Sequence, residues 1–124
     1  MYDKELTSHI LSQINETILK ILKRFKCVKT TNGFTDTESG MEKFDSICML
    51  LIALGEALKN LDKVTNRELL IKYPQIDWKK AKGLRDIISH HYFEMDADII
   101  FDVCKTKIPE VSQTINQIIN DIKS

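Results

Sequence analysis

The sequence is short of the residues that make turns, because its 124 residues include only 4 Gly and 2 Pro. A sandwich or barrel of short strands needs turn residues at frequent intervals, so this scarcity excludes such folds and favours a mostly helical chain. A chain of this length has room for one globular domain and rarely for two. We therefore expect a single helical domain over residues 1–124.

Cysteine is also scarce, and long hydrophobic runs are missing. Cys27, Cys48 and Cys104 are odd in number and form no C-x-x-C pair, which excludes a disulfide framework and a zinc knuckle. We expect all three to be small buried residues. The sequence contains no run of about 18 apolar residues and no apolar segment directly after its first residues. These features predict a soluble cytoplasmic protein with no membrane partner.

No charge of either sign is in excess, because 18 Lys and Arg balance 18 Asp and Glu. The whole molecule therefore has no long-range field that attracts nucleic acid, and any phosphate contact must come from a local cluster of side chains. Hydrophobic residues make up 43% of the chain and charged residues 29%, which is typical of a folded protein rather than a disordered one.

Apolar residues spaced three and four apart predict helices along most of the chain. A polar stretch over residues 29–36 is a loop by composition. The expected helices cover residues 5–25, about 38–61, 78–92, 97–107 and a last segment with Pro109 in its first turn. The predicted fold is an all-α bundle of about five helices plus a short connector.

Polar residues before these segments are candidate N-caps. They are Asp36 or Thr37 for the second helix, Asp77 for the helix over 78–92 and Asp96 for the next one. The pattern from Thr65 to Glu68 predicts a capping box that opens a short helix. This helix must stop near residue 73, because Pro74 disfavours helical geometry in the residue before it.

Titratable side chains gather on the helix over 78–92 more densely than elsewhere. At about 100° per residue, one arc of this helix holds Arg85, Asp86, Ser89, His90 and Tyr92. The apolar face lies roughly opposite, so the helix can bury one side and present the other. A solvated face that holds an Arg and a His by chance is the simpler alternative.

The spacing within this arc suits acid–base chemistry on a phosphate. Asp86 and His90 are four residues apart, so the carboxylate can orient the imidazole and favour its protonated form. Arg85, on the adjacent stripe, has a planar fork that suits phosphate oxygens. In metal-free RNA cleavage, a base takes the 2′-hydroxyl proton and a cation stabilises the charge on the phosphate.

Other residues near the arc have simpler interpretations. His91 falls on the apolar face, and we expect it to pack against the core or to lie in an interface. The lone Trp78 is expected to pack. Neighbouring His, Tyr and Glu residues over 90–94 are too close in sequence to supply the three or four converging ligands of a metal site, so we expect no metal.

The pattern R-x-x-x-x-H-x-Y, formed by Arg85, His90 and Tyr92, resembles the HEPN superfamily. It is similar in particular to the HepT-like toxins that are paired with minimal nucleotidyltransferase antitoxins. The likeness spans roughly residues 41–111. Three further stretches support it in the order that the family shows: Leu54-Gly55-Glu56-Ala57, Tyr73-Pro74-Gln75-Ile76-Asp77-Trp78 and Ile108-Pro109-Glu110.

This resemblance implies an up-and-down helical bundle that forms a homodimer, in which the two motif helices line one cleft. It implies a metal-independent endoribonuclease that needs no cofactor, acts on RNA rather than DNA and uses Arg85 and His90 as catalytic residues. Asp86, Ser89 and Glu56 are the expected supporting residues. Asp86 departs from the Asn that is frequent in the family, and an acid beside the phosphate site can weaken RNA binding.

The resemblance also implies a means of regulation. The family's Tyr falls on Tyr92, whose hydroxyl the partner nucleotidyltransferase modifies with AMP. The added phosphate would lie near Arg85 and repel RNA. Two alternatives remain: a non-catalytic dimeric partner of a nucleotidyltransferase, and a plain interaction bundle whose Arg and His have no chemical role.

Overall fold

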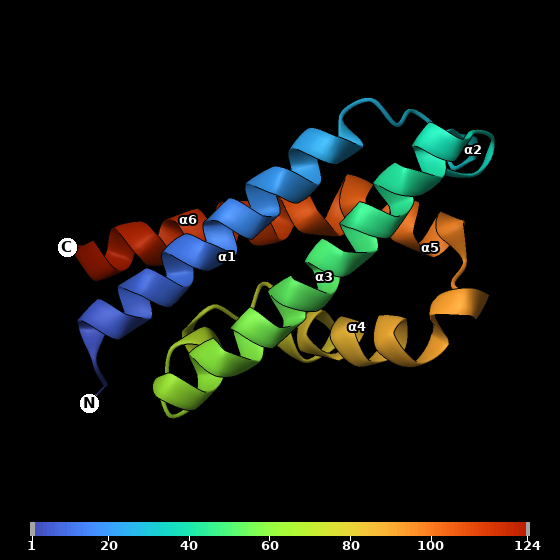
Figure 1. Cartoon of the computed structure of the whole chain (residues 1–124). Helices are drawn as coiled ribbons and strands as arrows, with labels where there is room; N and C mark the ends of the chain where they lie inside the picture. The colour runs from blue at the N-terminus through green and yellow to red at the C-terminus, as the bar shows by residue number, and fades with distance from the viewer. Residues whose placement is uncertain (1, 124) are drawn as a thin grey trace.

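Long helices that alternate in direction form the fold, and the computed structural model describes residues 2–123 (Figure 1). The two ends of the chain lie at the same end of the bundle. The main segments are α1 (Lys4–Phe25), α3 (Glu38–Val64), α4 (Trp78–His91), α5 (Ala97–Asp102) and α6 (Ile108–Lys123). This confirms the predicted all-α bundle.

The core forms where α1 packs against α3 and α6. Its fully buried side chains follow the predicted apolar stripes, as in Ile14, Ile18, Ile47, Leu51, Leu58, Ile115 and Ile118. At one end, the ring of Phe34 is fully buried and lies 5.3 to 6.4 Å from the rings of Phe25, Phe44 and Phe101. Phe34 belongs to a short helix, α2 (Asn32–Thr35), within the stretch that was predicted to be a loop. The buried ring explains why this stretch folds against α3.

Three of the predicted N-caps are confirmed. Oxygens of Thr37, Asp77 and Asp96 accept hydrogen bonds from backbone N–H groups two or three residues later, at 2.9, 3.1 and 2.8 Å. Thr37, rather than Asp36, caps α3. These bonds satisfy N–H groups that have no partner within the helix.

The predicted capping box at Thr65 is wrong. Thr65 lies at the end of α3, and its hydroxyl donates a hydrogen bond back to the Leu61 carbonyl at 2.8 Å. Asn66 and Arg67 then adopt left-handed φ angles of 54° and 62°, which stop the helix. The connector contains only a 3₁₀ turn, η1 (Leu70–Lys72), which ends before Pro74 as predicted.

The predicted break between the helix over 97–107 and the last helix is also wrong. A π-helical turn, η3 (Val103–Lys107), joins α5 to α6 without interruption. The Ile108 N–H bonds to the Val103 carbonyl, five residues earlier. Pro109 has no N–H to donate, so the carbonyls before it lose their regular partner and the wider turn accommodates this loss.

The cysteines differ in their surroundings. Cys48 and Cys104 are buried, as predicted, and burial raises the pKa of each thiol to about 12. Cys27 is exposed, because it lies just after the end of α1, so its predicted burial is wrong.

The loop before α4 holds this helix in place. The Tyr73 hydroxyl donates to Asp121 at 2.7 Å, and the Trp78 indole N–H donates to the Tyr73 carbonyl at 2.9 Å. Trp78 is buried at the start of α4, which confirms its packing role. Through these contacts, the start of α4 is tied to α6.

The apolar face of α4 is only partly covered. Ile88 is fully buried against the core, but Ile87 is 52% exposed. Leu84 and Ile87 line a cleft of about 540 Å³, opposite Val103 and Val111. The helix therefore buries less of this face than its sequence predicts. Within residues 2–123, no helix combines the length and the apolar character needed to cross a bilayer.

Candidate active site

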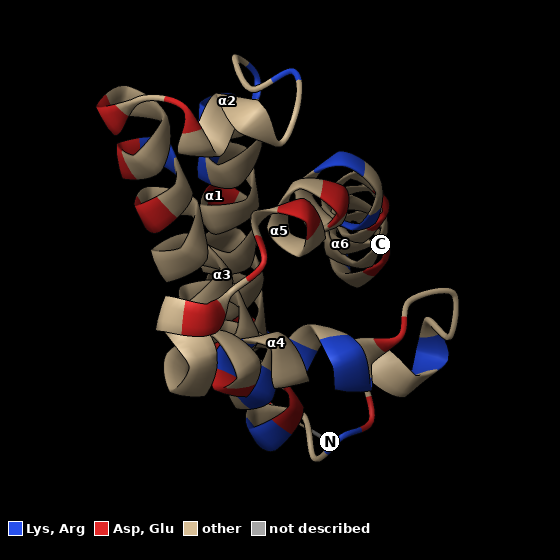
Figure 2. Ribbon diagram, turned by 90° about the vertical axis from the view of Figure 1, so that its right-hand side faces the viewer, with Lys and Arg blue, Asp and Glu red and all other residues tan. Residues whose placement is uncertain are grey.

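The polar arc of α4 lies along the outer flank of α3, where acidic and basic residues are interleaved (Figure 2). The contacts run in antiparallel order: Asp45 with Tyr92, Glu56 with Arg85, and Asp62 with Lys82. Arg85 and Tyr92, two members of the predicted arc, therefore face the charged side of α3.

Gly55 allows the two helices to come this close. A Cβ atom at this position would lie 2.8 Å from the Arg85 Cβ and 3.3 Å from the Lys82 carbonyl oxygen. Real Cβ atoms do not approach a neighbour so closely, so any larger residue would push α4 away from α3. Gly55 thereby sets the position of the Arg85 backbone.

Arg85 is held by two carboxylates. Its Nη1 donates to Asp86 Oδ1 at 2.7 Å, and its Nε lies 2.8 Å from Glu56 Oε1. The Nε–H is not aimed at this oxygen with hydrogen-bond geometry, so the contact with Glu56 is a charge pair. The hydrogen bond to Asp86 and the charge of Glu56 raise the pKa of Arg85. A guanidinium has five N–H donors, so donors remain for a phosphate.

The packing of α3 against α4 brings Glu56, one of the expected supporting residues, to Arg85. Its carboxylate comes from α3 and meets the guanidinium across the helix interface. The side chain of Arg85 stays 37% exposed, so the pair lies at the rim of the molecule and not in its core.

Asp86 does not orient His90, and this part of the prediction is wrong. One Asp86 oxygen accepts from Arg85, and the other lies 3.4 Å from Lys59 Nζ. These two cations lower the pKa of Asp86, with the Arg85 hydrogen bond as the larger cause. Hydrogen bonds from the charged Arg85 and Lys59 stabilise the Asp86 carboxylate more than a bond from His90, one turn along the helix, would.

His90 and Ser89 are exposed at the end of α4. Within residues 2–123 the His90 imidazole makes no hydrogen bond or ion pair, so it is open to an incoming ligand. His91 is also exposed, 3.9 Å from Glu94, so the prediction that it packs against the core is wrong for the isolated chain. His91 is the last residue of α4.

Tyr92 begins a 3₁₀ turn, η2 (Tyr92–Glu94), directly after α4. Its hydroxyl donates to the Asp45 carboxylate on α3. This hydrogen bond, followed by burial, raises the pKa of Tyr92 to about 12. The tyrosine is accessible at the surface, with its hydroxyl beside a group that can accept its proton.

Tyr92 and Arg85 contact different carboxylates of α3. Their partners Asp45 and Glu56 are eleven residues apart on α3, which corresponds to roughly 16 Å along the helix. Along α4 itself, Tyr92 follows Arg85 by seven residues, which corresponds to roughly 10 Å. The position of an AMP group on Tyr92 relative to Arg85 stays a prediction.

Sequence reasoning missed two residues of this site, Asp45 and Lys59. Asp45 carries no motif signal. Lys59 lies three residues after Glu56 on α3, and this helical spacing was the one available clue. Among the described residues, no three His, Cys, Asp or Glu side chains are grouped as metal ligands would be.

Comparison with known proteins identifies similar sequences. Residues 9–118 match the family described as Ribonuclease HepT-like. The chain is 41% identical to "Putative RNase MJ0127" of Methanocaldococcus jannaschii over 106 residues, which are 83% of this chain and 84% of the relative. It is 34% identical to "Putative RNase TTE0752" of Caldanaerobacter subterraneus subsp. tengcongensis over 70 residues, 56% of this chain and 59% of the relative. No solved structure matches the chain.

Proposed function

This chain belongs to the HepT-like ribonuclease family, and we propose that it is a metal-independent endoribonuclease in which Arg85 and His90 are the catalytic residues. The observation that carries this proposal is the surroundings of these two side chains on α4. Arg85 is held in place by carboxylates yet remains partly exposed, and His90 is open to solvent.

The proposed reaction needs a base, a cation and an acid. His90 takes the proton of a 2′-hydroxyl, and the oxygen attacks the adjacent phosphorus. Arg85 stabilises the negative charge that builds up on the phosphate oxygens. The bond from phosphorus to the 5′-oxygen breaks, and a solvent water molecule, acting as the acid, gives this oxygen its proton. The products are a 2′,3′-cyclic phosphate and a 5′-hydroxyl.

A homodimer would complete this site. His90 follows Arg85 by five residues, which places the two about 140° apart around α4, so a second chain related by a two-fold axis can supply the facing residue. Exposed apolar side chains near the motif support such a contact: Met49 is 67% exposed, Ile87 52% and Phe93 100%. We propose that the motif helices of two chains line one cleft.

We further propose that the protein is the toxin of a pair whose antitoxin is a minimal nucleotidyltransferase. In the proposed modification, the Tyr92 oxygen attacks the α-phosphorus of ATP, a P–O bond forms and pyrophosphate leaves. Asp45, which already accepts the Tyr92 hydrogen bond, is placed to receive the proton. The negative phosphate would then repel RNA at the dimer cleft.

A second candidate function is that of a non-catalytic partner of the nucleotidyltransferase. The observation that favours it is the neutralisation of Arg85 by Glu56 and Asp86, since an arginine shared between two carboxylates binds phosphate more weakly. This candidate predicts a tight complex with the nucleotidyltransferase and no RNA cleavage by the free protein.

The test is cleavage of total RNA in EDTA by the purified protein, with mass spectrometry to show that Tyr92 is unmodified. We expect cleavage, loss of activity in Arg85→Ala and His90→Ala, and RNA ends that carry a cyclic phosphate. His91→Ala is the matched control, because it removes an exposed histidine from the adjacent position. Equal activity of His90→Ala and His91→Ala would contradict the proposed roles.

A further inference from the structure

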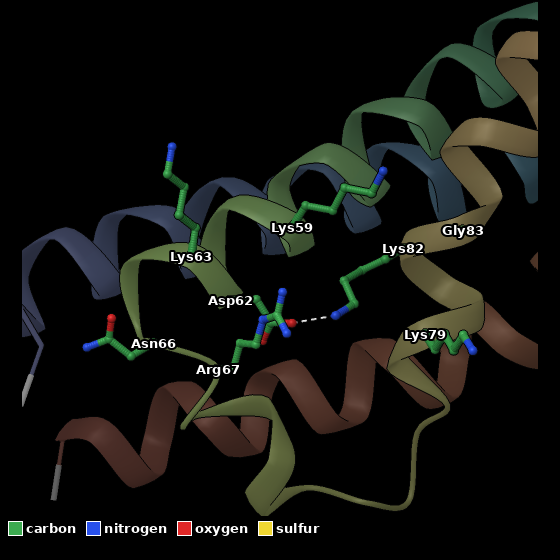
Figure 3. A pocket seen from close by; sticks show the side chains of 8 residues that line it. All are labelled: Lys59, Asp62, Lys63, Asn66, Arg67, Lys79, Lys82 and Gly83. Carbon is green, nitrogen blue, oxygen red and sulfur yellow. Dashed lines mark hydrogen bonds and ion pairs between the residues drawn. The ribbon is translucent and has the colours of Figure 1, made fainter.

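A groove lined by cations lies between the C-terminal half of α3 and the N-terminal half of α4 (Figure 3). We call it the basic groove. Its volume is about 690 Å³. The residues that line it are Lys59, Asp62, Lys63, Asn66, Arg67, Lys79, Lys82 and Gly83.

Positive charge dominates the basic groove, although the chain as a whole is neutral. Five of its lining residues are Lys or Arg and one is acidic. That acid, Asp62, forms an ion pair with Lys82, which reaches across from α4. Within residues 2–123, no ion pair neutralises Lys63, Arg67 or Lys79. The local excess of charge is therefore not cancelled by the surrounding side chains.

Helical spacing and the end of α3 assemble this cluster. Lys59 and Lys63 lie four residues apart on α3, and Lys79 and Lys82 lie three residues apart on α4. Asn66 lies just after the end of α3. Arg67 follows in a left-handed conformation, which turns the chain at the end of the groove. A Cβ atom on Gly83 would meet nothing within 4 Å, so this side of the groove is open.

The basic groove continues directly into the candidate active site. At its inner end, Lys59 Nζ lies 3.4 Å from Asp86 Oδ2, and the other oxygen of that carboxylate accepts from Arg85. Lys59 and Arg85 thus contact the two oxygens of one carboxylate. A chain of phosphates that leaves Arg85 along α3 and α4 would enter the groove.

We propose that the basic groove binds the sugar–phosphate backbone of the RNA that flanks the phosphate at Arg85. This inference rests on the proposed ribonuclease function and extends it to the length of RNA that the protein holds. None of the residues that line the groove is hydrophobic or aromatic. It therefore lacks the large apolar anchors of a protein interface and the aromatic rings on which bases stack. Contacts with phosphates alone make the binding independent of sequence.

The test removes three groove charges in the His90→Ala background, so that the RNA is not cut. The groove variant is Lys63→Gln/Arg67→Gln/Lys79→Gln. The control variant, Lys20→Gln/Lys26→Gln/Lys123→Gln, removes the same charge from exposed lysines near α1 and on α6. Binding of fluorescein-labelled oligouridine, either three or twelve nucleotides long, is followed by fluorescence anisotropy over a range of NaCl concentrations.

We expect the groove variant to bind the longer RNA several-fold more weakly. The slope of log K against log salt should fall by about 2, because each lost phosphate contact to a single strand accounts for roughly 0.7. Binding of the three-nucleotide RNA should stay the same, because it does not reach along the groove. The control variant should match the His90→Ala protein with both RNAs.

Unchanged affinity and slope in the groove variant would overturn the proposal, and so would an equal loss in the control variant. If RNA binding is unchanged but capture of the nucleotidyltransferase is lost, the groove binds protein instead. Circular dichroism and the Tm of each variant check that it is folded. The single substitution Lys79→Gln should lower the slope of log K against log salt by about 0.7. Absence of RNA cleavage by the unsubstituted protein would refute the proposed function, but the binding result would still decide whether the groove holds RNA.

Discussion

Replacement of Gly55 by alanine tests whether the close approach of α3 and α4 builds the site. The added methyl would lie 2.8 Å from the Arg85 Cβ, whereas carbon atoms pack at about 3.5–4.0 Å. The neighbouring atom is the first carbon of a side chain, which cannot swing away without its backbone. We therefore expect α4 to move outward by roughly 1 Å and Arg85 to lose its present contact with Glu56.

Two opposing effects set the magnitude for Gly55→Ala. Overpacking at a tight contact costs about 1–3 kcal/mol of unfolding free energy. Alanine in a helix interior gains about 0.5–1 kcal/mol over glycine. The net change is a loss of roughly 0–2.5 kcal/mol. Gly83→Ala is the matched control on the facing helix, because its methyl enters open space and only the helical gain applies.

The assay is urea unfolding followed by circular dichroism, at one protein concentration because a dimer's stability depends on it. We expect Gly83→Ala to be more stable than Gly55→Ala by about 1–3 kcal/mol. RNA cleavage by Gly55→Ala should fall further than its unfolded fraction explains. Equal stabilisation by the two substitutions would refute the reasoning, because it would show that the helices do not constrain each other at this point.

Further outcomes follow from the charges around the motif. Asp86→Asn removes one of the two carboxylates on Arg85, so we expect tighter RNA binding in an anisotropy titration; weaker binding would show that the carboxylate positions the arginine. Because Arg85 lowers the pKa of Asp86, the ionised Asp86 carboxylate stabilises the fold at pH values above the usual pKa of an aspartate. This stabilisation is lost as the pH falls through the lowered pKa. The stability of Asp86→Asn should not show this loss in acid. Asp45→Asn should return the pKa of Tyr92 from about 12 towards 10 in an NMR titration of labelled tyrosine. Because its pKa is raised, neutral Tyr92 stabilises the fold below pH 10, and this stabilisation is lost between about pH 10 and 12. If Asp45→Asn leaves the alkaline unfolding profile unchanged, the contact between Tyr92 and Asp45 is contradicted. Native protein should react with a thiol reagent at Cys27 alone; modification of three cysteines would mean that the core opens.

Local sequence determined the helices, most of their caps and the family. Apolar spacing reports which residues share a face, and this depends only on the 3.6-residue turn of the helix. The same periodicity placed the candidate catalytic residues on one arc. It failed at Thr65, because a hydroxyl there can cap a new helix or bond back to the old one, and only the surrounding chain decides between them.

Tertiary structure decided which charges meet. Asp86 could pair along its own helix with His90, but the register between α3 and α4 brings Lys59 and the neighbouring Arg85 to its two oxygens. The same register joins Tyr92 to Asp45. It also gathers lysines that are about 20 residues apart in sequence into the basic groove. Periodicity along one helix carries no information about this register, which depends on close packing at Gly55 and on the anchored loop before α4.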